Sequence, residues 1–279
     1  MANEAMRKQW NEASGPEWVL LEQAFDRMLA PIGDELVQRA AAAPGEHVLD
    51  VGCGFGTTTL ALAAAVGASG RVMGLDISAP LLDRARQRGR DAGAGNVVWR
   101  DGDAQVAPLP ATHFDLVVSR FGVMFFDDPT AAFANLAGAV KPGGRLCFAC
   151  WQPAERNPWY TFPSRSLAPH IDLPPLPFAQ GPGPFAFGDP DHVRAVLTAA
   201  GFANVGIEGF ETRLGLGADG SVEATIAFVT RGPLGQALTA APDEARRSGI
   251  EALGSGLADH VVDGEVRFPA AVWFVTARR

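Results

Sequence analysis

The sequence predicts an α/β protein in which helices cover a parallel sheet. Two observations favour this fold class. Between residues 44 and 151, short β-rich apolar runs alternate with amphipathic stretches, which is typical of strand–helix–strand units. In addition, a chain of 279 residues with 47% hydrophobic and 19% charged residues can bury a sizeable core, which excludes disordered and fibrous proteins.

A helical cover is expected over residues 1–43. Apolar residues recur at helical spacing between residues 17 and 42. Pro31 falls inside this pattern, and because proline disrupts the interior of a helix, two helical segments separated by Pro31 are expected. The turn Ala43-Pro44-Gly45 should end the second segment.

Five strands are expected in the central part of the chain, residues 44–151. These strands are His47–Val51, Arg71–Asp76, Val97–Asp101, Phe114–Ser119 and Arg145–Trp151. The helices between them are expected at Thr57–Val66, Ala79–Asp91 and Thr130–Val140. Ser78 is the expected N-cap of the second helix, and a tight turn is expected over residues 141–144 after the third.

Residues 152–188 are expected to form an ordered lid over a pocket. Residues 153–190 contain ten of the chain's 21 prolines, which argues against a regular helix or a central strand. The stretch is also too aromatic for a solvated linker. Its aromatic residues, with the one that precedes it, are Trp151, Trp159, Tyr160, Phe162, Phe178, Phe185 and Phe187.

Residues 189–279 are expected to complete the same α/β domain. A helix from Asp189 or Pro190 to Ala200 is followed by two further expected strands, near Val205–Glu211 and Ala271–Thr276.

Charge and cysteine content exclude several classes of function. The formal net charge is −8, which leaves no basic field for nucleic acid. No apolar run approaches the roughly 18 residues of a membrane span, so a cytoplasmic protein is expected. Cys147 and Cys150 lie on opposite faces of one expected strand, so neither a metal site nor a redox pair is predicted. Nothing in the sequence indicates the oligomeric state.

The most informative segment joins the first strand to the first helix through Gly52, Gly54 and Gly56. Glycines let the backbone approach a ligand closely, and the helix N-terminus offers unpaired N–H groups. An ordinary βα turn is the plain alternative. A nicotinamide site is another, but its G-x-G-x-x-G pattern would require glycine at the position of Thr57.

Two acidic residues follow the next two strands. Asp76 lies 20 residues after Gly56, where a carboxylate can accept both hydroxyls of a ribose in a dinucleotide or an adenosine site. Asp103 follows the third strand and could accept from an adenine amino group. A simple turn carboxylate is the alternative for Asp103.

Five ordered motifs together resemble the class I S-adenosylmethionine-dependent methyltransferases, in particular the small-molecule enzymes similar to those of ubiquinone biosynthesis. The motifs are VLDVGCGFGTTT, GLDIS, GDA, FDLVVSRFGVMFF and LAGAVKPGGRL. The resemblance covers about residues 10–151. It implies a doubly wound, Rossmann-like, seven-stranded sheet whose last strand is antiparallel. It also implies S-adenosylmethionine bound across the carboxyl edge of residues 44–151, S-adenosylhomocysteine as product, and methylation of a small, apolar or aromatic acceptor at carbon or oxygen.

The resemblance also assigns residues to the cofactor. Those implied around its methionine part are Asp50, Gly52, Cys53, Gly54 and Ser119. Asp76 would take the ribose hydroxyls, with Ile77 against the adenine, while Asp103 and the backbone of Ala104 would read the adenine edge. Arg120 would lie beside the methionine part and the transferred methyl group. The N-terminal aromatic, often tyrosine in relatives, would be Trp10 or Trp18.

The acceptor is expected in an apolar cavity lined by aromatic residues, among them Phe121, Trp151, Trp159 and Phe162. The fold requires no general base. Tyr160 and His170 are candidates because they lie in the expected lid, and packed lid residues are the alternative for both. Two other functions stay open at this stage. One is a protein of this fold that binds the cofactor without transferring methyl, such as a cyclase, and the other is a nicotinamide oxidoreductase.

Overall fold

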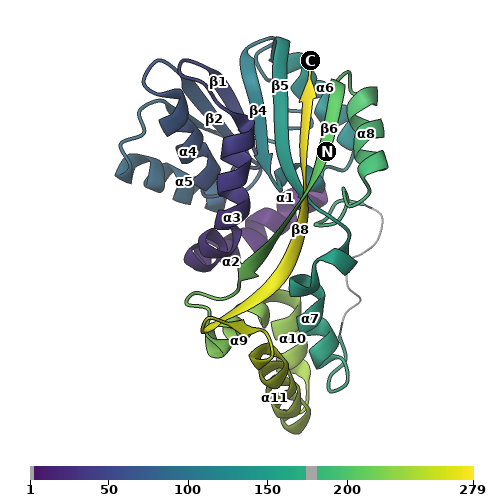
Figure 1. Ribbon diagram of the computed structural model, residues 1–279. Coiled ribbons are helices and arrows are strands. Elements are labelled where there is room, and N and C mark those ends of the chain that lie inside the picture. Colours follow the sequence, from purple (N-terminus) through teal and green to yellow (C-terminus); the bar gives the residue numbers. More distant parts are fainter. Residues whose placement is uncertain (1–2, 174–180) are drawn as a thin grey trace.

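The computed structural model describes residues 3–173 and 181–279, and its centre is an eight-stranded sheet (Figure 1). The strands are β1 (His47–Val51), β2 (Arg71–Asp76), β3 (Val97–Asp101), β4 (Phe114–Arg120), β5 (Val140–Trp151), β6 (Ala203–Gly215), β7 (Val261–Val262) and β8 (Glu265–Arg278). Their order is β3-β2-β1-β4-β5-β8-β6, and β7 pairs only with β8. The order reverses between β1 and β4, which is where α/β sheets bind ligands.

The last long strand is the reversed one. β8 is antiparallel to both β5 and β6, whereas β1 to β5 pair in parallel. The Rossmann-like path of seven strands with a final antiparallel strand is therefore confirmed, and the two-residue β7 is an addition to it.

Helices cover both faces of the sheet. They are α1 (Glu4–Glu12), α2 (Ser14–Leu20), α3 (Glu22–Ala40), α4 (Thr57–Val66), α5 (Ala79–Asp91), α6 (Pro129–Ala139), α7 (Pro158–Leu167), α8 (Pro190–Ala199), α9 (Val222–Val229), α10 (Gly232–Ala240) and α11 (Asp243–Ala258). In Figure 1, α3, α4 and α5 lie on one face, and α6 and α8 lie on the other. α1 and α2 lie across one end of the sheet.

The expected helix break at Pro31 is wrong. α3 continues through Pro31, and the chain instead breaks at Leu21, between α2 and α3. Proline removes a single backbone donor from a helix. The face of α3 that carries Met28, Ile32 and Leu36 is fully buried, and this burial outweighs that local cost.

The proline-rich stretch contains a regular helix, contrary to expectation. α7 begins at Pro158, where a proline costs no hydrogen bond, and it continues through Pro163. Of the residues predicted for the lid, Phe178 lies outside the described part of the chain, as do Pro174, Pro175 and Pro177. In the rest of the stretch, α7 packs against β8, and Phe187 packs against Phe148 of β5.

Three helices that the sequence patterns did not indicate follow β6. β6 and β8 extend past the parallel strands, and α9, α10 and α11 pack with α7 at their far end (Figure 1). Leu253, Leu257 and Phe268 are fully buried in this layer.

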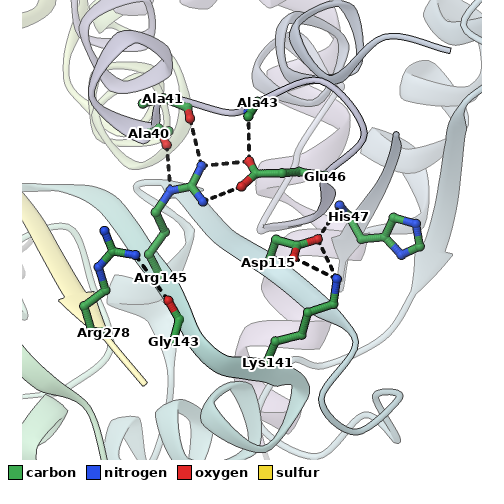
Figure 2. Close-up of polar contacts among 10 residues, drawn as sticks. All are labelled: Ala40, Ala41, Ala43, Glu46, His47, Asp115, Lys141, Gly143, Arg145 and Arg278. Carbon is green, nitrogen blue, oxygen red and sulfur yellow. Dashed lines mark hydrogen bonds and ion pairs between the residues drawn. The ribbon is translucent and has the colours of Figure 1, made fainter. Parts of the chain in front are cut away.

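A polar cluster holds the edge of the sheet at which the parallel strands begin (Figure 2). Arg145 pairs with Glu46 through two contacts of 2.6 and 2.8 Å and also donates to the carbonyls that end α3. Asp115 accepts from Lys141 at 2.7 Å and from the backbone of His47 at 2.9 Å. The expected tight turn over residues 141–144 is part of β5, with a register shift against β4.

Candidate functional site

The turn between β1 and α4 uses three glycines in the left-handed backbone region. Gly52, Gly54 and Gly56 have φ angles of 66°, 56° and 87°. A Cβ atom on Gly52 would lie 2.6 Å from the Cα of Gly122, because the turn packs directly against the segment that follows β4. A Cβ on Gly54 would meet nothing within 4 Å, so Gly54 faces open space.

That space is a pocket at the carboxyl ends of β1, β2 and β4. Its lining residues are Asn3, Met6, Trp10, Trp18, Val51, Gly52, Gly54, Leu75, Asp76, Ile77, Leu81, Gly102, Asp103, Ala104, Arg120, Phe121, Gly122, Phe125 and Phe126. The fold thus brings together residues from the N-terminus to position 126. The cavity measures about 110 Å³.

Asp76, at the end of β2, is held by backbone donors. The N–H of Gly54 donates to one of its oxygens at 2.7 Å and the N–H of Ser78 donates to the other at 2.9 Å. Burial raises the pKa of the carboxyl, and these hydrogen bonds oppose that shift. Each oxygen keeps lone pairs that can accept from hydroxyl groups in the pocket.

Asp103 has a spare acceptor. One oxygen accepts from the backbone of Gln105 at 2.9 Å and from the side chain of Asn3 at 2.8 Å. The other oxygen is buried and has no hydrogen-bond partner among the described residues. A buried carboxylate oxygen without a partner is costly, so this atom suits a donor such as an amino group of a bound molecule.

Asp50, Cys53 and Ser119 lie behind the pocket lining. Asp50 accepts from the Thr59 hydroxyl at 2.6 Å through one oxygen, and its other oxygen has no partner in the described structure. Burial raises the pKa of Asp50 to about 7. Ser119 donates to the carbonyl of Val51 at 2.7 Å, which ties β4 to the glycine turn, while burial raises the pKa of the Cys53 thiol.

Trp10 and Trp18 place two aromatic rings from the N-terminal helices on the pocket wall. The Ser78 hydroxyl donates to the carbonyl of Trp10 at 2.8 Å, and the Asn11 side chain donates to the carbonyl of Ile77 at 2.9 Å. Ser78 occupies the expected N-cap position of α5, but its hydroxyl makes this long-range contact instead of a cap hydrogen bond. The part of the pocket wall formed by Ile77 is thereby tied to the N-terminal helices.

Sequence reasoning missed Asn3 and Met6 as pocket residues. Asn3 lies a hundred residues before Asp103 in the sequence, and its side-chain amide donates a hydrogen bond to the Asp103 carboxylate. Asn3 and Asp127 also form two hydrogen bonds of 2.6 Å with each other. Neither residue belongs to a motif, so no local signal could have found them.

Phe121 connects the pocket with the strand behind it. Its φ angle is 66°, a strained value for an aromatic residue, and such strain is concentrated at functional sites. Its ring stacks on Trp151, with centroids 4.2 Å apart and planes 9° apart. Trp159 packs against Trp151 at 4.8 Å, so one row of rings runs from the pocket to α7.

The remaining predicted residues lie outside the pocket lining. Tyr160 packs between Trp159 and Phe185, and burial raises the pKa of its hydroxyl. Phe162 packs against Phe268, and His170 lies next to Gly249 of α11. The structure therefore does not bring either proposed base to the pocket wall.

Within residues 3–173 and 181–279, no group of three or more His, Cys, Asp or Glu side chains could hold a metal ion. No helix of that described part is long and apolar enough to cross a membrane.

Comparisons with known proteins point to one family. The family model described as "Methyltransferase domain" matches residues 48–144. Aklanonic acid methyltransferase DauC of Streptomyces sp. (strain C5) is 32% identical over 148 residues, which cover 53% of this chain and 67% of that protein. Demethylmenaquinone methyltransferase of Lactiplantibacillus plantarum is 41% identical over 113 residues, which cover 40% of this chain and 48% of that protein.

The fold comparison agrees with the sequence comparison. A solved structure of a putative methyltransferase from Bacillus halodurans C-125 matches with a TM-score of 0.58 at 21% identity, covering 88% of this chain and 97% of that one. The family model covers the part of the chain that carries the glycine turn and both acidic strand ends, and the relatives match only part of their own length. The matches span about two thirds of the first relative and about half of the second.

Proposed function

Because the chain belongs to the class I S-adenosylmethionine-dependent methyltransferases, related to the enzymes of ubiquinone and menaquinone biosynthesis, we propose that it methylates a small apolar or aromatic molecule at carbon or oxygen. S-adenosylmethionine is the proposed cofactor and S-adenosylhomocysteine the product. The relatives' names, which specify aklanonic acid and demethylmenaquinone, support a small-molecule acceptor.

The observation that carries this proposal is the donor and acceptor pattern of the pocket. Asp76 offers lone pairs for two ribose hydroxyls, and the unpartnered oxygen of Asp103 offers one for the adenine amino group. Gly54 leaves space where a side chain would obstruct the methionine part. The residues present thus fit the cofactor, with Ile77 and Ala104 on the adenine side.

The bound cofactor supplies an already activated methyl group. The contribution of the chain is therefore to bind, orient and exclude water. Trp10, Trp18, Phe121 and Phe125 give the pocket an aromatic wall that can hold the acceptor in place. Among the described residues that line it there is no histidine or tyrosine, so we propose that orientation, without a general base from the wall, carries the reaction.

The functional division of the chain is also a proposal. Residues 1–43 cover the site, residues 44–151 hold the cofactor, residues 152–188 wall the acceptor side, and residues 189–279 complete the sheet. A cytoplasmic location likewise stays a prediction.

Two measurements, made one after the other, test the proposed function. Calorimetry with S-adenosylhomocysteine should show binding to the wild-type protein and much weaker binding to Gly54→Val, because the valine side chain would enter the space beside Gly54. Methyl-labelled S-adenosylmethionine is then incubated with a panel of quinones, phenols and aromatic acids. Label recovered in an acceptor supports a transferase, whereas tight binding without transfer to any acceptor would favour a binder that does not methylate.

A further inference from the structure

Arg120 is the one cationic side chain among the described residues that line the pocket. It ends β4 and extends toward α3. A Cβ atom on Gly33 of α3 would lie 3.0 Å from a guanidinium nitrogen of Arg120. The missing side chain at Gly33 therefore gives the guanidinium its place between α3 and the pocket.

This guanidinium has no hydrogen bond, ion pair or ring contact with any residue of the described ranges 3–173 and 181–279. Three acids, Asp26, Asp50 and Asp34, act on it through space without contacting it, and the first two are engaged elsewhere. Asp26 accepts from Thr57 at 2.5 Å and pairs with Arg88 at 3.0 Å. Asp50 accepts from a threonine hydroxyl.

An arginine cannot relieve this situation by losing its proton, although burial lowers the pKa of Arg120. Its N–H donors therefore lack partners of their own within the described part of the chain. Arg88, which lies beside the same Asp26, does have a partner, because it pairs with Asp26 and with Glu22. A partly buried cation without a partner at the wall of a pocket is stabilised by an anion that enters the pocket.

We propose that Arg120 is the anion-binding residue of the pocket and pairs with a carboxylate of a bound molecule. The planar guanidinium matches a carboxylate through two parallel hydrogen bonds, and the neighbouring rings of Trp18 and Phe121 exclude the water that would weaken them. Two sources of this carboxylate exist, the amino-acid end of the cofactor and an acidic methyl acceptor. The inference rests on the proposed function.

The first part of the test compares S-adenosylhomocysteine with 5′-methylthioadenosine, which keeps the adenosine and the thioether but has no carboxylate. Calorimetry is run on the wild type, Arg120→Met, Arg120→Lys and the control Arg71→Met, which removes an exposed arginine from β2. If the cofactor supplies the carboxylate, Arg120→Met weakens S-adenosylhomocysteine by about 10-fold or more. Binding of methylthioadenosine then stays within about twofold.

The second part titrates the complex with S-adenosylhomocysteine using 2-naphthoate and 2-naphthol, which differ in the carboxylate. If an acidic acceptor is the source, Arg120→Met weakens naphthoate by about 10-fold or more and leaves naphthol and S-adenosylhomocysteine unchanged. The proposal is overturned if Arg120→Met changes neither the affinity ratio of S-adenosylhomocysteine to methylthioadenosine nor that of naphthoate to naphthol. Arg120→Lys keeps the charge without the planar fork and should give intermediate ratios, which carry the test if the methionine variant does not fold.

Thermal unfolding without ligand supplies an independent readout. Because the guanidinium has no internal partner, Arg120→Met should melt at the wild-type temperature or above it. A clearly lower melting temperature for both Arg120→Met and Arg120→Lys would show that the guanidinium has a structural partner in the protein and would overturn the proposal. Failure of the wild-type protein to bind S-adenosylhomocysteine would refute the proposed function itself, whereas normal binding with an unaffected arginine variant would refute this inference alone.

Discussion

Asp76 is the residue whose place in the pocket is fixed most completely by the backbone. Two N–H groups orient its carboxylate, so its substitution should affect the cofactor more than the fold. Asp76→Ala is expected to weaken binding of S-adenosylhomocysteine by roughly 1–3 kcal/mol, because two hydroxyls lose a charged acceptor. Calorimetry measures the effect. Asp101→Ala is the matched control, since Asp101 ends the neighbouring strand but faces solvent and pairs with Arg7. Equal affinities for wild type and Asp76→Ala would remove Asp76 from the site.

Asp50 predicts a pH dependence of stability. Its pKa is 3.8 in the ordinary state and about 7 in the folded protein, where burial disfavours the charged form. Between these pH values the folded protein keeps a proton that the unfolded chain has released. Stability therefore falls as the pH rises from about 4 to 7 and levels off above, by roughly 4 kcal/mol in all. Asp50→Asn cannot titrate, yet it still offers Thr59 an acceptor.

Melting temperatures of wild type and Asp50→Asn between pH 5 and 8 test this prediction. Every other titrating group is shared by the two proteins, so the advantage of the asparagine variant should grow from pH 5 to about pH 7 and level off above. Parallel curves would contradict the raised pKa.

Single residues were predictable from the sequence where they directly follow a strand. Asp76 and Asp103 were expected at strand ends because carboxyl ends of parallel strands meet at one edge of a sheet, and both line the pocket. Asn3 was not predictable, because its contact with Asp103 depends on how the N-terminus folds back over the sheet.

At the scale of elements, Arg145 fastens the end of α3 to the sheet (Figure 2). Its guanidinium donates to the carbonyls of Ala40 and Ala41 and pairs twice with Glu46, and it holds the pKa of that carboxyl below its usual value. Both partners of the pair are about one-fifth exposed.

Arg145→Met should lower the free energy of unfolding by about 2–4 kcal/mol, since it leaves Glu46 and two helix-end carbonyls without a donor. Chemical denaturation measures the loss. Lys141→Met is the control, because the Lys141–Asp115 pair nearby is more exposed and should contribute less than about 1 kcal/mol. Equal losses would show that the Arg145 cluster has no special role.

The boundaries of helices and strands were predicted best where local sequence signals and tertiary packing favour the same residues. β1, β2, β3, α4 and α5 begin and end at the expected residues. At Pro31 and Pro163 the predicted absence of a continuous helix was wrong. A single proline is tolerated when the rest of the helix is buried, and burial depends on the whole fold. The three helices α9 to α11 were not predicted, because the elements against which they pack, among them α7, β8 and α3, are distant in the sequence.

On the scale of the whole molecule, the question is whether residues 152–188 help to position the acceptor or contribute only to the stability of the fold. The row of rings from Phe121 through Trp151 to Trp159 reaches the pocket, whereas Phe162 faces the helical layer at the far end of β8. A Cβ atom on Gly256 of α11 would lie 2.7 Å from the Phe162 ring, so this packing is tight. The two aromatic residues of α7 should therefore behave differently.

Trp159→Ala should lower turnover of an identified acceptor by about 10-fold, because the ring that supports Trp151 and, through it, Phe121 is lost. Its affinity for S-adenosylhomocysteine should stay near the wild-type value. Phe162→Ala should instead lower the free energy of unfolding by about 3–5 kcal/mol, while the protein that stays folded keeps normal turnover. Melting curves, cofactor titrations and turnover on the same two variants separate the outcomes. If Trp159→Ala lost stability with normal turnover in the folded fraction, α7 would be core on both sides, and the acceptor wall would have to come from the N-terminal helices alone.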